Sequence, residues 1–240
     1  MTHPAIRELF QSPGRHPAFQ EVVRRLNAER GGGTSHPPLS LSGLAPTAKA
    51  RYLALLWQLT GRPLLVLSAG GKEAEALFGP LAAFFDLVVA GECPRPQYLP
   101  APDVLPFQRM SPHSEVSAER ASALWRLSTR PIPVTVAPVA SALLRIEAPE
   151  FYRQLALALR AGDEIPMEDF VAHLESIGYT RREPVEMVGE FSVRGGIVDV
   201  FPAGAPGPVR IEMFGDTVES MRRFDVETQR SVLKLQDCRI

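Results

Sequence analysis

The stretch Val209–Phe214, with the sequence VRIEMF, alternates at every position and predicts a β-strand that buries one of its two faces. The buried face would carry the three apolar residues Val209, Ile211 and Met213. The outward face would carry, at intervals of about 7 Å, the three residues Arg210, Glu212 and Phe214. Arginine and aromatic side chains are enriched at the points of protein interfaces that contribute most to affinity. The outward face is therefore a candidate binding surface, and a solvated face with one stray aromatic ring is the alternative.

The same period of two extends over the neighbouring residues and predicts a small antiparallel sheet. Four strands are expected, at residues 183–188, 190–201, 208–214 and 217–224. Arg194 falls on the outward face of this sheet, the same face as Arg210 and Glu212. Two short helices precede the strands, at residues 150–159 and 167–177. The pattern predicts an α+β domain over residues 149–234, with residues 235–240 beginning a segment that returns to the preceding domain.

Residues 1–148 instead alternate between helical and strand patterns, which is typical of an α/β domain. Helical spacing of apolar residues occurs at residues 19–26, 46–59 and 115–127. Short apolar runs of strand length occur at residues 64–67, 86–90 and 133–137. A continuous apolar run such as residues 64–67 predicts a parallel strand that is buried on both faces. The fold class expected for the chain is thus α/β, a parallel-sheet domain followed by an α+β domain with an antiparallel sheet.

A Gly-Gly-Lys turn follows the first apolar run and resembles a phosphate-binding loop. In the pattern G-x-x-x-x-G-K-[ST], backbone amides surround the phosphates and the final hydroxyl binds magnesium. Gly71 and Lys72 match that pattern, but Val66 replaces the first glycine and Glu73 replaces the hydroxyl. A carboxylate at Glu73 would repel a triphosphate. The loop is therefore expected to be a degenerate, inactive nucleotide site, and ATP is not expected as a cofactor of this chain.

The remaining composition excludes other classes of function. The 240 residues are 45% hydrophobic, as in globular proteins, and their net charge of -1 argues against a strongly basic nucleic-acid-binding protein. The five histidines and two cysteines share no metal-ligand spacing, and no nucleophile motif is present. No run approaches the roughly 20 apolar residues of a membrane helix, and no secretory signal is visible. No catalytic residue, metal site or membrane partner is expected, and the predicted location is cytoplasmic.

Three segments carry a family likeness, at residues 189–202, 210–216 and 224–231. They closely resemble a domain shared by the bacterial excision-repair protein UvrB and the transcription-repair coupling factors. Further motifs resemble the first domain of the coupling factors and lie at residues 105–107, 111–113 and 117–120. UvrB has an intact phosphate loop and a long aromatic hairpin, for which residues 98–107 are too short. The sequence therefore resembles the N-terminal, UvrB-like region of a coupling factor, and a degenerate P-loop NTPase-like fold is implied for the first domain.

The resemblance implies a function for the chain. Coupling factors are ATP-dependent DNA translocases that displace stalled RNA polymerase and recruit UvrA to begin nucleotide excision repair. ATP, Mg²⁺, RNA polymerase and double-stranded DNA would be bound by other regions of such a protein, and this chain would be a non-catalytic UvrA-binding part. Motif matching implies that UvrA is contacted by Arg194, Arg210 and Phe214, with Arg181 and Glu212 as weaker candidates. Because the three main residues are predicted to point outward, their truncation is expected to leave the melting temperature almost unchanged.

Two alternatives to UvrA recruitment stay open from the sequence. The first is a shortened UvrB-like enzyme that uses ATP and binds damaged DNA. The second is a structural role, in which the UvrB-like module packs against the rest of the coupling factor and masks its own UvrA-binding face. Masking would use the same residues as recruitment, so their identity alone does not separate the two roles.

Overall fold

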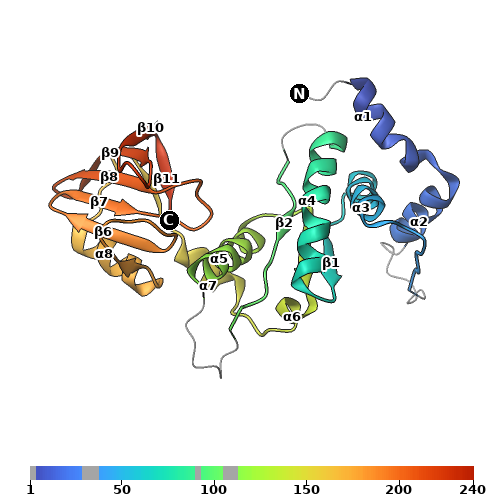
Figure 1. Ribbon diagram of the computed structural model, residues 1–240, viewed down its shortest axis with the longest axis horizontal. Helices are drawn as coiled ribbons and strands as arrows, with labels where there is room; N and C mark the ends of the chain where they lie inside the picture. The colour runs from blue at the N-terminus through green and yellow to red at the C-terminus, as the bar shows by residue number, and fades with distance from the viewer. Residues whose placement is uncertain (1–3, 29–37, 90–92, 105–112) are drawn as a thin grey trace. The chain divides into compact units, whose positions relative to one another are not determined.

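The computed structural model describes residues 4–28, 38–89, 93–104 and 113–240. The described chain divides into two compact units (Figure 1). The first unit comprises Met1–Ala101 and Arg130–Arg145, and the second comprises Pro102–Thr129 and Ile146–Ile240. One unit holds a parallel sheet and the other a largely antiparallel sheet, which confirms the mixed α/β class predicted from the sequence. The family-like motifs at residues 105–107 and 111–112 lie outside the described residues.

The first unit is built on a parallel sheet that has, in its described part, the strand order β1-β3-β2. Its strands are β1 (Leu64–Ser68), β2 (Gln97–Tyr98) and β3 (Val134–Pro138). Its helices are α1 (Pro4–Gln11), a 3-10 turn (Ser12–Arg15), α2 (Pro17–Ala28), α3 (Pro46–Thr60), α4 (Gly71–Val88) and α6 (Val139–Ala142). Side chains of α3, α4 and β3 form one buried cluster, while α2 and α3 share a second.

Two expectations for the first unit were wrong. Residues 86–88 continue α4 instead of beginning a strand, because Leu81, Phe85 and Val88 follow a helical spacing and are all buried. The apolar run at residues 64–67 is not buried on both faces, since Leu65 and Leu67 are exposed on the edge strand β1. Burial on both faces applies to β3, the central strand of the described sheet.

The second unit contains, in the described residues, a six-stranded sheet of order β10-β9-β8-β7-β6-β5. Neighbouring strands are antiparallel except for the parallel pair β5 and β6. The strands are β5 (Thr180–Arg181), β6 (Glu190–Arg194), β7 (Ile197–Val200), β8 (Val209–Phe214), β9 (Thr217–Phe224) and β10 (Ser231–Leu235). Residues 183–188, all of them described, form a loop rather than the predicted strand.

A tight turn divides the predicted strand at residues 190–201 into β6 and β7. Gly195 has a φ of 58°, in the left-handed region that favours glycine. A Cβ atom on Gly196 would lie only 2.7 Å from the carbonyl oxygen of Met213 on β8. The two glycines therefore permit both the reversal of the chain and its close approach to the third strand.

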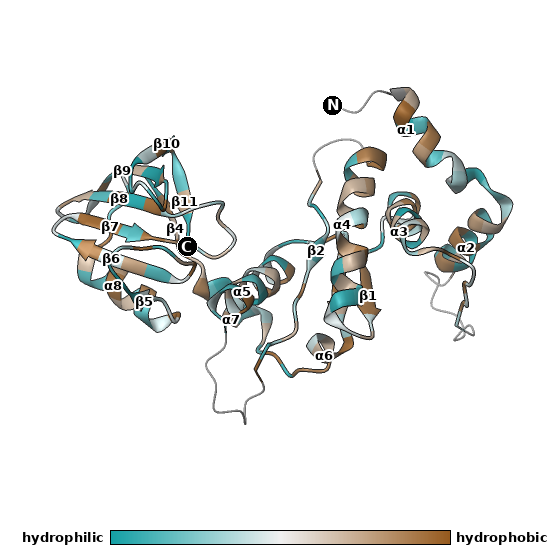
Figure 2. Cartoon of the chain, viewed as in Figure 1, coloured by the Kyte–Doolittle hydropathy of each residue, from teal (hydrophilic) through white to brown (hydrophobic). Residues whose placement is uncertain are grey.

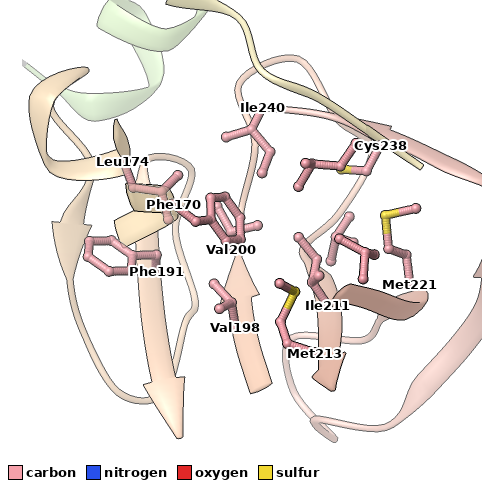
Figure 3. Close-up of a cluster of buried hydrophobic side chains, with 13 residues drawn as sticks. Phe170, Leu174, Phe191, Val198, Val200, Ile211, Met213, Met221, Cys238 and Ile240 are labelled. Carbon is pink, nitrogen blue, oxygen red and sulfur yellow. The ribbon is translucent and has the colours of Figure 1, made fainter. Parts of the chain in front are cut away.

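The core of the second unit lies between one face of this sheet, helix α8 (Met167–Ser176) and a two-stranded ribbon (Figure 3). The ribbon pairs β4 (Ala158–Arg160) with β11 (Asp237–Arg239). Cys238 and Ile240 are buried in the same core cluster as Phe170 of α8 (Figure 3). Residues 237–240 thus complete the second unit, which differs from the expected return segment to the first.

Helix α5 (Ser114–Thr129) also groups with the second unit, although the sequence placed it before the boundary at residue 148. It packs against α7 (Pro149–Leu155), where Arg153 Nε donates a hydrogen bond of 2.6 Å to the carbonyl of Ser128. The guanidinium of Arg239 on β11 stacks over the ring of Trp125 on α5, 4.5 Å from its centroid. These contacts join α5 to α7 and to the ribbon of β4 and β11, which the sequence pattern did not connect with it.

Candidate protein-interaction site

The face of the second unit's sheet that points away from the core carries most of the predicted site residues. Hydrophilic and hydrophobic residues alternate along β6 and β8 (Figure 2), as the sequence predicted. Val209, Ile211 and Met213 are buried on the core side, so their neighbours on β8 point outward. The strand register pairs Ser192 with Asp199 and Asp199 with Arg210. The outward face is therefore shared by the residues at Arg194, Asp199, Arg210, Glu212 and Phe214.

Asp199 joins the two predicted arginines in one charged cluster. Arg210 donates two hydrogen bonds to it, from Nε to Oδ1 at 2.7 Å and from Nη2 to Oδ2 at 2.8 Å. Arg194 donates a third, from Nη2 to Oδ2 at 2.6 Å. Asp199 was not among the site residues predicted from the sequence. The sequence feature that could have identified this residue is a carboxylate at an outward position in the otherwise apolar strand Ile197–Val200.

The two arginines of this cluster differ in their environment. The side chain of Arg210 is 18% exposed and that of Arg194 is 46% exposed. The Arg210 guanidinium also stacks over Phe224, 4.9 Å from the ring centroid, and contacts the carbonyl of Gln229 at 3.4 Å. Hydrogen bonding to Asp199 raises the pKa of the Arg210 guanidinium above its ordinary value. Arg210 is thus a fixed, largely buried cation, whereas Arg194 remains half available to a partner.

Phe214 is strongly exposed, with 80% of its surface accessible. It ends β8, pairs with Thr217 and precedes the hairpin turn at Gly215, whose φ is 60°. Burial of such a large, exposed apolar ring by a partner would contribute favourable free energy to binding. Phe214 therefore has the geometry of an interface anchor.

Glu212 lies between these groups on the outward face and is engaged within the sheet. Its carboxylate accepts a hydrogen bond from Ser220 Oγ and pairs with Arg222 Nη2 at 3.3 Å. The pair with Arg222 is partly exposed, and such surface pairs contribute little to stability. Glu212 is brought to the predicted face, with its charge compensated by its own neighbours.

Arg181 is the predicted residue that the structure separates from the others. It pairs in register with Phe191, whose side chain lies in the core. The pleat therefore places Arg181 on the opposite face of the sheet from Arg194. The adjacent Arg182, whose backbone N–H donates to the carbonyl of Phe191, follows in the alternation on the outward side. The sequence could not choose between these neighbours because the register of β5 was unknown.

The buried pairing of Arg210 changes one stability expectation. Truncation at this position was expected to be harmless because the side chain points outward. Arg210→Ala would instead leave the Asp199 carboxylate with Arg194 alone and remove the stacking on Phe224, so the free energy of unfolding should fall by about 1–2 kcal/mol. Urea unfolding monitored by circular dichroism measures this loss. Arg182→Ala is the matched exposed control, and equal stability of the two variants would contradict the cluster's structural contribution.

The Gly-Gly-Lys loop of the first unit connects β1 to α4, the strand–turn–helix context that a phosphate loop requires. One backbone amide of this loop has a partner within the chain, because Ala69 N–H donates a hydrogen bond to Glu73 Oε2 at 3.2 Å. The chain's own carboxylate thus accepts one backbone amide of this loop and adds a negative charge beside it. Gly71 and Lys72 form the first turn of α4, directly after this loop.

In the described part of the chain, no group of three histidine, cysteine or acidic side chains is arranged to hold a metal ion. Burial raises the pKa of the Cys238 thiol to about 11, which keeps it protonated near neutral pH. None of the described helices has the length and apolar character needed to cross a membrane.

Comparisons with known proteins match the domain that carries the outward face of the sheet. Residues 157–240 match the family model described as the UvrB interaction domain. The transcription-repair-coupling factor of Mycobacterium bovis is 38% identical over 223 residues, which cover 90% of this chain and 17% of that protein. The chain belongs to the transcription-repair-coupling factor family, as part of its N-terminal region.

Two further members of the coupling-factor family support this assignment. The factor of Myxococcus xanthus is 35% identical over 221 residues, covering 91% of this chain and 18% of the relative. The factor of Bacillus subtilis is 28% identical over 201 residues, which cover 83% of this chain and 16% of the relative. The chain therefore spans about a sixth of the length of these coupling factors, and the outward face lies inside its UvrB interaction domain.

Proposed function

We propose that this chain binds UvrA through the outward face of its antiparallel sheet, and that it thereby recruits UvrA to RNA polymerase stalled at DNA damage. The observation that carries the proposal is the joint presentation of Arg194 and Phe214 on one sheet face. That face belongs to the matched domain, residues 157–240. Contact with RNA polymerase and with double-stranded DNA is proposed for other regions of the complete coupling factor.

The proposed interface combines two kinds of contact. Phe214 would enter an apolar pocket of UvrA, and Arg194 would form charge-assisted hydrogen bonds beside it. Arg210 and Glu212 would support the surface, because each is engaged by neighbours on the sheet. Aromatic residues and arginines are the residue types enriched at protein interfaces, and this face presents both.

The experiment that tests this function measures binding of the purified 240-residue chain to purified UvrA by biolayer interferometry. We expect saturable binding that persists at physiological salt and is competed by UvrB, since both proteins would use the same domain type. The absence of saturable binding to UvrA would contradict the proposal. Binding that UvrB does not compete would place the contact on another surface.

We also propose that the chain itself is non-catalytic and takes no ATP at the loop of residues 66–73. Glu73 already accepts the Ala69 amide there, and its charge opposes a triphosphate. Isothermal titration with ATP and Mg²⁺ should therefore give no heat of binding. A dissociation constant in the micromolar range would overturn the proposal and favour the UvrB-like enzyme instead. A loss of that affinity in Lys72→Ala would locate the bound nucleotide at this loop.

A further inference from the structure

We propose that Asp199 is the positioning residue of the binding face, and that it holds Arg194 in the orientation that meets the partner. This inference rests on the proposed UvrA-binding function and names a residue that the family motif did not supply. Asp199 lies opposite Ser192 and Arg210 in the strand register, at the centre of the outward face. It is a positioning residue because its side chain is only 2% exposed and has no surface to offer a partner.

The carboxylate of Asp199 is shared between its two arginines. Oδ1 accepts from Arg210 Nε, and Oδ2 accepts from both Arg210 Nη2 and Arg194 Nη2. The two-pronged bond to Arg210 fixes the carboxylate plane, because a guanidinium fork matches a carboxylate in one geometry. Arg210 itself is held by Phe224 and by the Gln229 carbonyl. Oδ2 is therefore a fixed acceptor at the point where Arg194 attaches.

Arg194 is the member of the cluster that a partner can reach. A single bond of 2.6 Å ties its Nη2 to Asp199, while 46% of the side chain is exposed. A free arginine loses much rotamer freedom when it is fixed in an interface, so holding it beforehand lowers the cost of binding. The bond to Asp199 thus fixes one end of the Arg194 guanidinium while the rest of the side chain stays accessible.

The chain offers a matched control at Glu183. Its Oε1 lies 3.7 Å from Arg194 Nη1, so this carboxylate also faces the same guanidinium. Glu183 is exposed and, among the described ion pairs, has no link to Arg210. Glu183→Gln removes one negative charge beside Arg194 without disturbing the fixed acceptor. Asp199→Asn removes one negative charge and also weakens that acceptor.

The test is a double-mutant cycle of UvrA affinity with the 240-residue chain, comparing Asp199→Asn, Arg194→Ala and the double variant. We expect Asp199→Asn to weaken binding about tenfold in the wild-type background and less than twofold in the Arg194→Ala background. A merely structural role would weaken binding equally in both backgrounds and would overturn the proposal. A tenfold loss in Glu183→Gln would overturn it too, since any nearby charge would then suffice.

Thermal melts establish that each variant is folded before its affinity is compared. If Asp199→Asn does not fold, the same cycle is run with Arg210→Lys, which keeps the charge but loses the fork. Its effect should again disappear in the Arg194→Ala background, and an additive effect would overturn the proposal. The proposed function fails if Phe214→Ala and Arg194→Ala leave UvrA binding intact. If both weaken binding and the Asp199 effect is additive, the positioning proposal alone fails.

Discussion

Phe214→Ala is expected to weaken UvrA binding by about 30-fold or more, which corresponds to about 2 kcal/mol of binding free energy. The ring is 80% exposed at the end of β8 and contributes little to the fold, so its removal should change the free energy of unfolding by less than about 0.5 kcal/mol. Parallel measurements of affinity by biolayer interferometry and of thermal stability check both parts of this prediction.

Leu143 provides a matched control for Phe214. It is also 80% exposed and apolar, but it belongs to the first unit, outside the matched domain. Leu143→Ala should leave UvrA affinity within about twofold of wild type, since it lies off the proposed surface. If Phe214→Ala bound UvrA normally, or melted early, the assignment of faces on β8 would be wrong.

Ile211→Ala, on the other face of the same strand, should lower the free energy of unfolding of the second unit by about 2–5 kcal/mol. Ile211 is fully buried within the core beside Met221 (Figure 3), and its truncation would leave a cavity between the sheet and the ribbon of β4 and β11. UvrA affinity should change little under conditions in which the variant stays folded, because the side chain does not reach the outward face.

The two tryptophans allow the unfolding of each unit to be followed separately. Trp125 belongs to the second unit and stacks on Arg239, whereas Trp57 packs against Phe85 in the first. In a Trp57→Phe background, urea unfolding followed by tryptophan fluorescence reports the second unit. Ile211→Ala should shift that transition strongly and Phe214→Ala should not. Equal shifts would contradict the inward and outward assignment of β8.

The faces of β8 were predictable because a strand alternates with a period of two, whatever its neighbours are. Burial of Val209, Ile211 and Met213, with Phe214 exposed, confirms that reading. The cluster around Asp199 was not predictable, because it depends on the register between β7 and β8. An eight-residue connection between those strands leaves several registers open, and only one places Asp199 opposite Arg210.

The errors in the first unit also have physical causes. A short, mostly apolar run such as residues 86–90 fits either a strand or the last turn of a buried helix. In the structure, residues 86–88 form the last turn of α4. The exposure of Leu65 and Leu67 depends on β1 lying at the sheet edge, which follows from strand order rather than local sequence. The register of β5 against β6, which the sequence leaves open, placed Arg181 opposite Phe191 and away from Arg194.

The most direct test of UvrA binding by the outward face is site-specific photo-cross-linking with p-benzoylphenylalanine. The probe replaces either Phe214 or Leu143, two positions of equal exposure, so neither substitution disturbs a core. Irradiation with purified UvrA should give a cross-linked product from position 214, with none above background from position 143. Efficient cross-linking from position 143, with none from position 214, would contradict the account.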